Sequence, residues 1–147
     1  MRNLLSEIFE RDLQKLKTEV NLYKSDEDLW KTDARIPNSG GNLCLHLIGN
    51  LQHFIGANLA DTGFVRDRDA EFSAKNISRS ELSAEIDKCI ATVVSGLQNL
   101  SDKDFEADYP EKYREKTVKT SWMMIHILTH LDYHLGQINY HRRFFTK

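Results

Sequence analysis

The sequence of 147 residues has little of what punctuates or cross-links a chain, with only 2 prolines, 7 glycines and 2 cysteines. Because glycine and proline mark the turns between strands, their scarcity argues against an all-β fold and favours a mostly helical one. The two cysteines, Cys44 and Cys89, stand alone in expected amphipathic helices, which indicates reduced core residues and no disulfide framework. At this length we expect one domain, residues 1–147, with a single core.

Charge of one sign and long hydrophobic runs are also missing. The chain carries 20 Lys and Arg against 22 Asp and Glu, a formal net charge of -2, so no excess positive field attracts phosphate and nucleic acid is not an expected partner. No apolar run reaches the roughly 18 residues that a bilayer requires, and the first residues lack a cationic segment followed by an apolar block. We therefore expect no membrane partner and a cytoplasmic location.

Apolar residues recur at spacings of three and four, which predicts four helices, at about residues 3–23, 39–60, 78–100 and 120–144. In the first helix the buried stripe is expected to be Leu4, Ile8, Leu13, Leu16 and Val20. Asn38 or Ser39 could cap the second helix, Ser78 to Glu81 matches a capping box, and Thr120 or Ser121 could cap the fourth. The connections 61–77 and 101–119 are long for a compact bundle, and we expect binding lids or solvated charged loops there.

The two most apolar of these helices contain all 6 histidines: His46 and His53 in the second, and His126, His130, His134 and His141 in the fourth. Neutral imidazole binds Zn, Ni, Cu and Fe. If the two helices are neighbours, their imidazoles can meet and bind a transition metal.

Helix geometry limits which histidines can share one ion. His126 and His130 are four residues apart, as are His130 and His134, and either pair can bind one metal. His126 and His134 are separated by about 12 Å of helix rise, so all three cannot. His46 and His53 are about 10 Å apart along the axis, and only one of them is expected to bind a given ion. The alternative is that these are hydrogen-bonded core or surface histidines, because an isolated HxxxH pattern is common.

Three segments carry a specific combination of motifs: SGGNLCLHLIGNL at 39–51, RDRDAEF at 66–72 and HLDYHLGQI at 130–138. Together they resemble the DinB/YfiT-like superfamily and, within it, a subgroup of small uncharacterised bacterial proteins. The resemblance spans nearly the whole chain. It implies an all-α four-helix bundle with a long crossover between the second and third helices. It also implies a divalent transition metal, nickel or zinc, bound by His46, His130 and His134.

The resemblance and helix geometry assign expectations to the neighbouring polar residues. His126 is expected to support the ligands or to lie in the core, His53 to pack or to contact substrate, and His141 to cap the helix or lie on the surface. Gln137 follows His134 by three residues on one helix face and is the expected hydrogen-bond partner of that ligand. An interhelical hydrogen bond is the alternative for Gln137.

Characterised relatives transfer low-molecular-weight thiols to electrophiles or isomerise thiol adducts, and others are described as metal-dependent hydrolases. The resemblance therefore implies a metal-dependent enzyme, thiol S-transferase-like, in stress or detoxification, with hydrolysis as the alternative. No Glu of an HExxH motif is present to serve as a base. Arg66, Arg68 and the loop from Tyr109 to Arg114 could recognise an anionic thiol cofactor, since Arg binds carboxylates well.

A reading from a different class is a non-catalytic helical bundle that binds a partner, with structural histidines. A homodimer is expected on either reading, because some apolar positions could point outward and leave exposed patches: Phe9, Trp30, Phe144 and Phe145.

Overall fold

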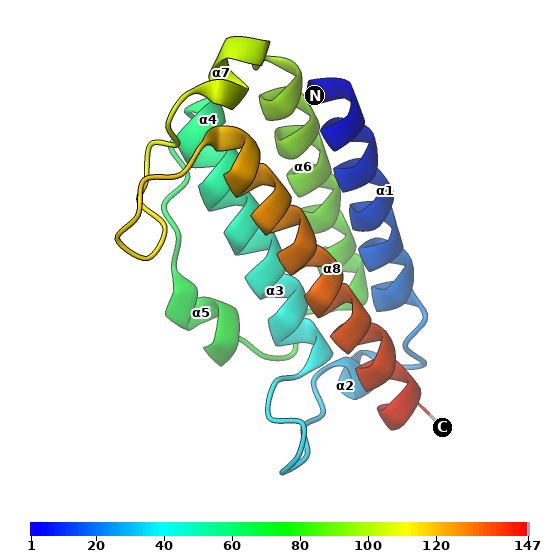
Figure 1. Ribbon diagram of the computed structural model, residues 1–147. Helices are drawn as coiled ribbons and strands as arrows, with labels where there is room; N and C mark the ends of the chain where they lie inside the picture. The colour runs from blue at the N-terminus through cyan, green and yellow to red at the C-terminus, as the bar shows by residue number, and fades with distance from the viewer. Residues whose placement is uncertain (147) are drawn as a thin grey trace.

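The computed structural model describes residues 1–146, and four long helices form a bundle (Figure 1). These are α1 (Arg2–Asn21), α3 (Gly40–Leu51) with its continuation η1 (Gln52–Ala57) and α4 (Asn58–Ala60), α6 (Arg79–Gln98), and α8 (Thr120–Phe145). Short helices lie in the connections: α2 (Asp26–Leu29), α5 (Arg68–Ser73) and α7 (Asp102–Glu106). The expected all-α four-helix bundle is confirmed.

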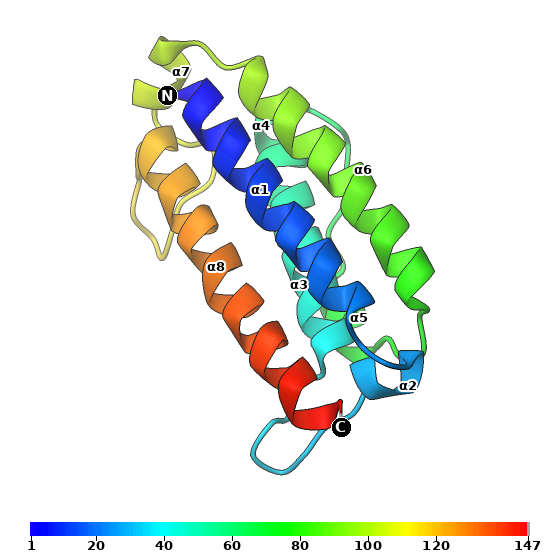
Figure 2. The same ribbon diagram turned by 90° about the vertical axis from the view of Figure 1, so that its right-hand side faces the viewer.

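The long crossover follows from the directions of the helices. In Figure 1, α1 and α8 run from top to bottom, whereas α3 and α6 both run from bottom to top. Because α3 and α6 are parallel, residues 61–78 must carry the chain back along the bundle. Helix α5 lies on this return and packs beside α3. Figure 2 shows the bundle from the right-hand side of Figure 1, where α1 lies between α8 and α6.

Capping side chains start two of the three helices for which the sequence predicts a cap. The Ser39 hydroxyl accepts a hydrogen bond from the Asn42 amide, and Ser78 forms a capping box with Glu81. Helix α8 differs, because Lys119 is its N-cap and provides no side-chain cap. Thr120, an expected cap, is buried and donates from both its amide and its hydroxyl to the Ala107 carbonyl. The connection from α7 therefore sets the start of α8.

The apolar stripe of α1 lies one residue later along its first turns than expected. Leu5 and Phe9 are buried, together with Leu13, Leu16 and Val20, whereas Leu4 is exposed. Phe9 was expected to face outward, and that expectation is wrong: its side chain is 0% exposed. The stripe keeps spacings of three and four residues, but packing against α6 and α8 selects which of two adjacent apolar rows turns inward.

Both cysteines are free and buried, as predicted. Burial raises the pKa of the Cys89 thiol to about 12 and also raises that of Cys44. Neither thiol is therefore suited to act as a nucleophile. Within residues 1–146, no helix combines the length and the apolar character needed to cross a membrane.

Candidate metal centre

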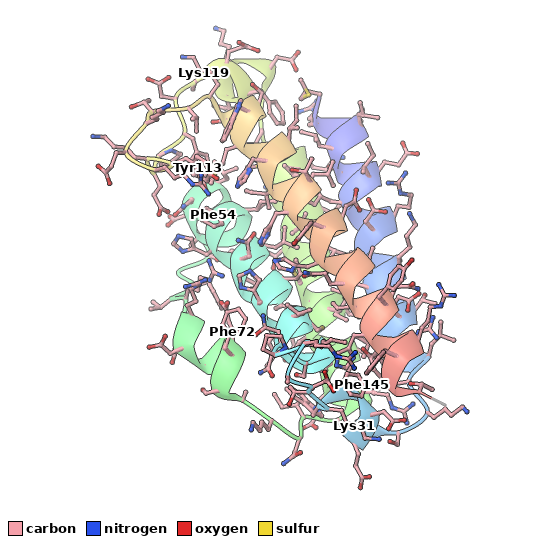
Figure 3. All side chains as sticks on the ribbon, turned by 60° about the horizontal axis from the view of Figure 1, so that its bottom comes forward. Lys31, Phe54, Phe72, Tyr113, Lys119 and Phe145 are labelled. Atoms are coloured by element: carbon pink, nitrogen blue, oxygen red, sulfur yellow. The ribbon has the colours of Figure 1, made fainter. Side chains whose placement is uncertain are left out.

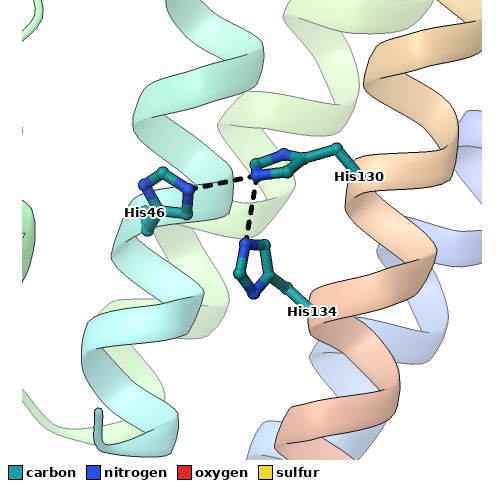
Figure 4. Close-up of side chains that lie close together, drawn as sticks. All are labelled: His46, His130 and His134. Atoms are coloured by element: carbon teal, nitrogen blue, oxygen red, sulfur yellow. Dashed lines mark hydrogen bonds between the residues drawn. The ribbon is translucent and has the colours of Figure 1, made fainter.

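Three imidazoles converge between α3 and α8 (Figure 4). The Nε2 atom of His130 lies 3.3 Å from Nε2 of His46 and 3.0 Å from Nε2 of His134. The ligand-capable atoms of all three residues lie within 4.8 Å of one another. Two Zn–N bonds of about 2.1 Å at a tetrahedral angle would place their nitrogens about 3.4 Å apart. The three nitrogens are therefore spaced to bind one metal ion.

Hydrogen bonds orient the outer two imidazoles. His46 Nδ1 lies 2.9 Å from Oε2 of Glu71 and 3.3 Å from Nη2 of Arg66. Because the nearer partner is a carboxylate, which only accepts, we assign the proton to Nδ1. His134 Nδ1 lies 2.6 Å from Oε1 of Gln137, and this is the hydrogen bond that the three-residue spacing predicts. Both residues thus direct an unprotonated Nε2 at the centre, which is the tautomer that a metal needs.

His130 occupies the middle of the cluster. Burial, followed by the neighbouring His134 and His46, lowers its pKa to about 4, so the imidazole is neutral at pH 7. Two lone pairs, those of His46 and His134, face His130 Nε2, and a single proton there can satisfy only one of them. A cation bound by all three nitrogens satisfies every lone pair at once. The donor set therefore fits a divalent transition metal.

The crossover supplies the support for His46. Glu71 on α5 is buried and also accepts hydrogen bonds from Arg66, at 2.6 Å from Nε and 2.9 Å from Nη2. Asn42 of α3 fixes this segment by donating to the backbone carbonyls of Glu71 and Ala74. Burial lowers the pKa of His46, against the opposing effect of the Glu71 carboxylate. The sequence alone assigned no role to Glu71, although this residue lies in the RDRDAEF motif at 66–72 that contributed to the family resemblance.

Gly49 makes room for this support. A Cβ at position 49 would lie 2.8 Å from Cδ of Glu71 and would overlap its Oε1. Real Cβ atoms essentially never come within 3.0 Å of such neighbours. Glycine at this helical position therefore allows the carboxylate to reach His46.

A cavity of about 470 Å³ adjoins the three histidines. Its walls include the aromatic residues Phe54, Phe72 and Tyr113, which come from η1, α5 and the loop before α8 and lie along the α3 side of the bundle (Figure 3). Arg66 and Arg68 also line it. A small molecule in this cavity would reach a metal bound by the cluster.

The structure places Arg66 and Arg68 differently within this wall. Arg66 donates two hydrogen bonds to the Glu71 carboxylate, so the charge of Arg66 is neutralised within the protein. The Arg68 guanidinium lies over the Phe72 ring, 5.6 Å from its centroid. Arg68 is therefore the one of the two with charge left for a ligand.

The remaining histidines lie outside the cluster. His126 lines the cavity and stacks on Trp122, with ring centroids 5.3 Å apart and an interplanar angle of 13°. His53 is 2.9 Å from a carboxylate oxygen of Glu111 and is not part of the cavity wall. His126 is thus part of the cavity wall, and His53 forms a surface pair with Glu111.

His141 was expected at a cap or on the surface, and this is wrong, because its side chain is buried at 2% exposure. Its Nε2 donates to the Lys31 carbonyl at 2.9 Å, and its Nδ1 lies 2.7 Å from the Tyr23 hydroxyl. Burial lowers its pKa. His141 thereby joins the end of α8 to Tyr23 and Lys31, on either side of α2, which are 118 and 110 residues away in the sequence.

The four-helix bundle is DinB-like in fold, as its similarity to solved structures shows. The crystal structure of a DinB-like protein from Bacillus cereus ATCC 10987 aligns with a TM-score of 0.69 and 16% identity, over 90% of this chain and 84% of that one. The structure of a conserved protein from Enterococcus faecalis aligns with a TM-score of 0.78 and 16% identity, over 99% and 96%. At such identities the likeness shows the fold alone.

The model of a DinB-like family, described as a protein of unknown function (DUF1572), matches residues 4–147, and the chain belongs to this family. No curated protein matches the chain. The resemblance seen in the sequence motifs is therefore confirmed at the level of family and fold.

Proposed function

We propose that this protein is a divalent-metal-dependent enzyme with His46, His130 and His134 as its metal ligands. The observation that carries the proposal is the convergence of three Nε2 atoms beside an open cavity. Three protein nitrogens with room for a further ligand are typical of catalytic zinc-type sites. Nickel and zinc are the proposed ions, because both suit imidazole.

We further propose thiol S-transfer as the reaction. When bound, a divalent metal lowers the pKa of a thiol or of water and so supplies the nucleophile. In thiol transfer, the thiolate sulfur bonds to an electrophilic carbon and the leaving group departs with its bonding electrons. No Asp or Glu is among the cavity-lining residues described within 1–146, and Glu71 is occupied by Arg66 and His46. No carboxylate base for water therefore lines the cavity. A thiol is more acidic than water and can release its proton to solvent when it binds the metal, which favours thiol transfer over hydrolysis.

A reduced thiol substrate suits the cytoplasm, and we propose that location for the protein. The two buried free thiols, Cys44 and Cys89, fit a reducing compartment. The substrate would be a small molecule, in keeping with a cavity of about 470 Å³.

Metal content tests the site. The protein is purified without a metal-binding tag and analysed by elemental mass spectrometry, alongside the variants His130→Ala and His126→Ala. The second variant is a matched control, because His126 lies on the same helix and in the same cavity but outside the cluster. We expect about one ion per chain in the wild type and His126→Ala, and a loss in His130→Ala. Full metal occupancy in His130→Ala would refute the ligand assignment.

Two substrates then separate the reactions. The metal-loaded protein is assayed for transfer of N-acetylcysteine to a bromobimane and for hydrolysis of a p-nitrophenyl ester. Metal-dependent acceleration of the first reaction supports the proposal, and acceleration of the second alone supports the hydrolase alternative. A metal-loaded protein that accelerates neither would favour a non-catalytic binding module.

A further inference from the structure

Asn50 is a buried polar side chain in the wall of the cavity beside the three histidines. It lies on α3 one turn after His46, lines the same cavity and is 8% exposed. Its buried amide oxygen Oδ1 has no hydrogen-bond partner within residues 1–146. Rotating the amide by 180° would exchange oxygen for nitrogen and leave a buried donor in the same position. In either orientation, the side chain has an unused hydrogen-bonding group.

Buried polar groups in proteins are nearly always hydrogen-bonded, and an unpartnered one in a cavity wall is a position that a ligand group can complete. The backbone around Asn50 supports this reading. Two residues later the α3 helix widens into the π-helix η1 (Gln52–Ala57), and π turns within α-helices are frequent at functional sites. An asparagine amide both donates and accepts, and its matching group is therefore another amide.

The charge of the cavity adds a second requirement. Within residues 1–146, the side chains that line the cavity include Arg66 and Arg68 and no carboxylate. Arg66 is paired with Glu71, whereas Arg68 has no ion pair within residues 1–146 and is held over the Phe72 ring. An unpaired guanidinium at a cavity wall is suited to bind a carboxylate.

We propose that Asn50 and Arg68 form a recognition subsite beside the histidine cluster, for a small thiol that carries an amide and a carboxylate. This inference rests on the proposed thiol chemistry and names its specificity residues. Asn50 pairs with the amide, and Arg68 pairs with the carboxylate. The two contacts hold the thiol sulfur toward the three histidines.

Three probes separate the two contacts: N-acetyl-L-cysteine has both groups, N-acetylcysteamine lacks the carboxylate, and 3-mercaptopropionate lacks the amide. Their dissociation constants are measured by titrating the cobalt-loaded protein and following its visible spectrum, which changes when a thiolate binds the ion. The wild type is compared with Asn50→Leu, which preserves volume, and with Arg68→Gln. Metal content of each variant is measured in parallel.

We expect Asn50→Leu to weaken the two amide-bearing probes about five- to tenfold and to leave 3-mercaptopropionate unchanged. Arg68→Gln should weaken the two carboxylate-bearing probes about tenfold or more and leave N-acetylcysteamine unchanged. If Asn50→Leu does not fold or load metal, Asn50→Ala should show the same pattern. Loss of affinity that is equal for all three probes, or absent, would overturn the subsite.

Failure of the subsite is distinguishable from failure of the proposed function. A wild type that binds cobalt but none of the three thiols overturns the thiol chemistry and the subsite with it. A wild type that binds the thiols, with variants that do not discriminate among the probes, overturns the subsite alone.

Discussion

Replacing Gly49 by alanine should weaken metal binding although position 49 touches no metal. The new Cβ would lie 2.8 Å from Cδ of Glu71, where ordinary contact begins at 3.4 Å. Cδ must therefore retreat by about 0.6 Å, and the overlapping oxygen by more. This carboxylate holds His46 at 2.9 Å, so its displacement loosens the orientation of this proposed ligand. We expect the protein to remain folded, because the atoms that must move are the end of a side chain.

The size of the effect follows from the role of Glu71. Loss of a hydrogen-bond partner behind a metal ligand typically costs 10- to 100-fold in metal affinity, or about 1.4 to 2.7 kcal/mol. Alanine in a helix interior contributes up to about 1 kcal/mol more helix stability than glycine. Gly49→Ala should therefore lose metal affinity without a comparable loss of stability in the metal-free protein.

Gly136 on α8 provides the matched control, since a Cβ there would meet nothing within 4 Å. Gly136→Ala should gain about 1 kcal/mol in the free energy of unfolding and keep its metal affinity. Affinities are measured by zinc competition against a chromophoric chelator, and stabilities by urea unfolding with a chelator present. An affinity of Gly49→Ala within twofold of the wild type would refute the reasoning, as would an equal loss in Gly136→Ala.

Two further predictions concern stability and assembly. His141 is buried with a lowered pKa, so the metal-free protein should lose stability as pH falls from 7 to 5. In urea unfolding, His141→Gln should reduce the dependence of the unfolding free energy on pH by up to about 1.4 kcal/mol per pH unit. Equal slopes for the wild type and the variant would contradict the prediction. We also propose a homodimer through the outer face of α8, where Tyr133 and Tyr140 are 65% and 73% exposed; Tyr133→Glu should shift sedimentation to the monomer, whereas a monomeric wild type would exclude the dimer.

Much of the bundle is local in origin and was readable from the sequence. Helix periodicity, the Ser39 cap and the Ser78 to Glu81 capping box depend on residues three or four apart, so they marked helices close to the observed α3 and α6. The same spacing made His134 and Gln137 neighbours before any fold was known. It also showed that one metal could not be shared by His126, His130 and His134, but it could not choose between the two pairs.

Tertiary structure makes His130 and His134 the candidate pair, because it places them beside His46. Packing of α3 against α8 brings His46 opposite His130 and His134 and leaves His53 with Glu111. The support for His46 comes from Glu71, 25 residues along the chain. Interactions within one helix repeat with its own period and are visible in a sequence. Contacts between helices depend on directions, rotations and crossovers that only the folded bundle sets, and these decided which residues form the candidate metal centre.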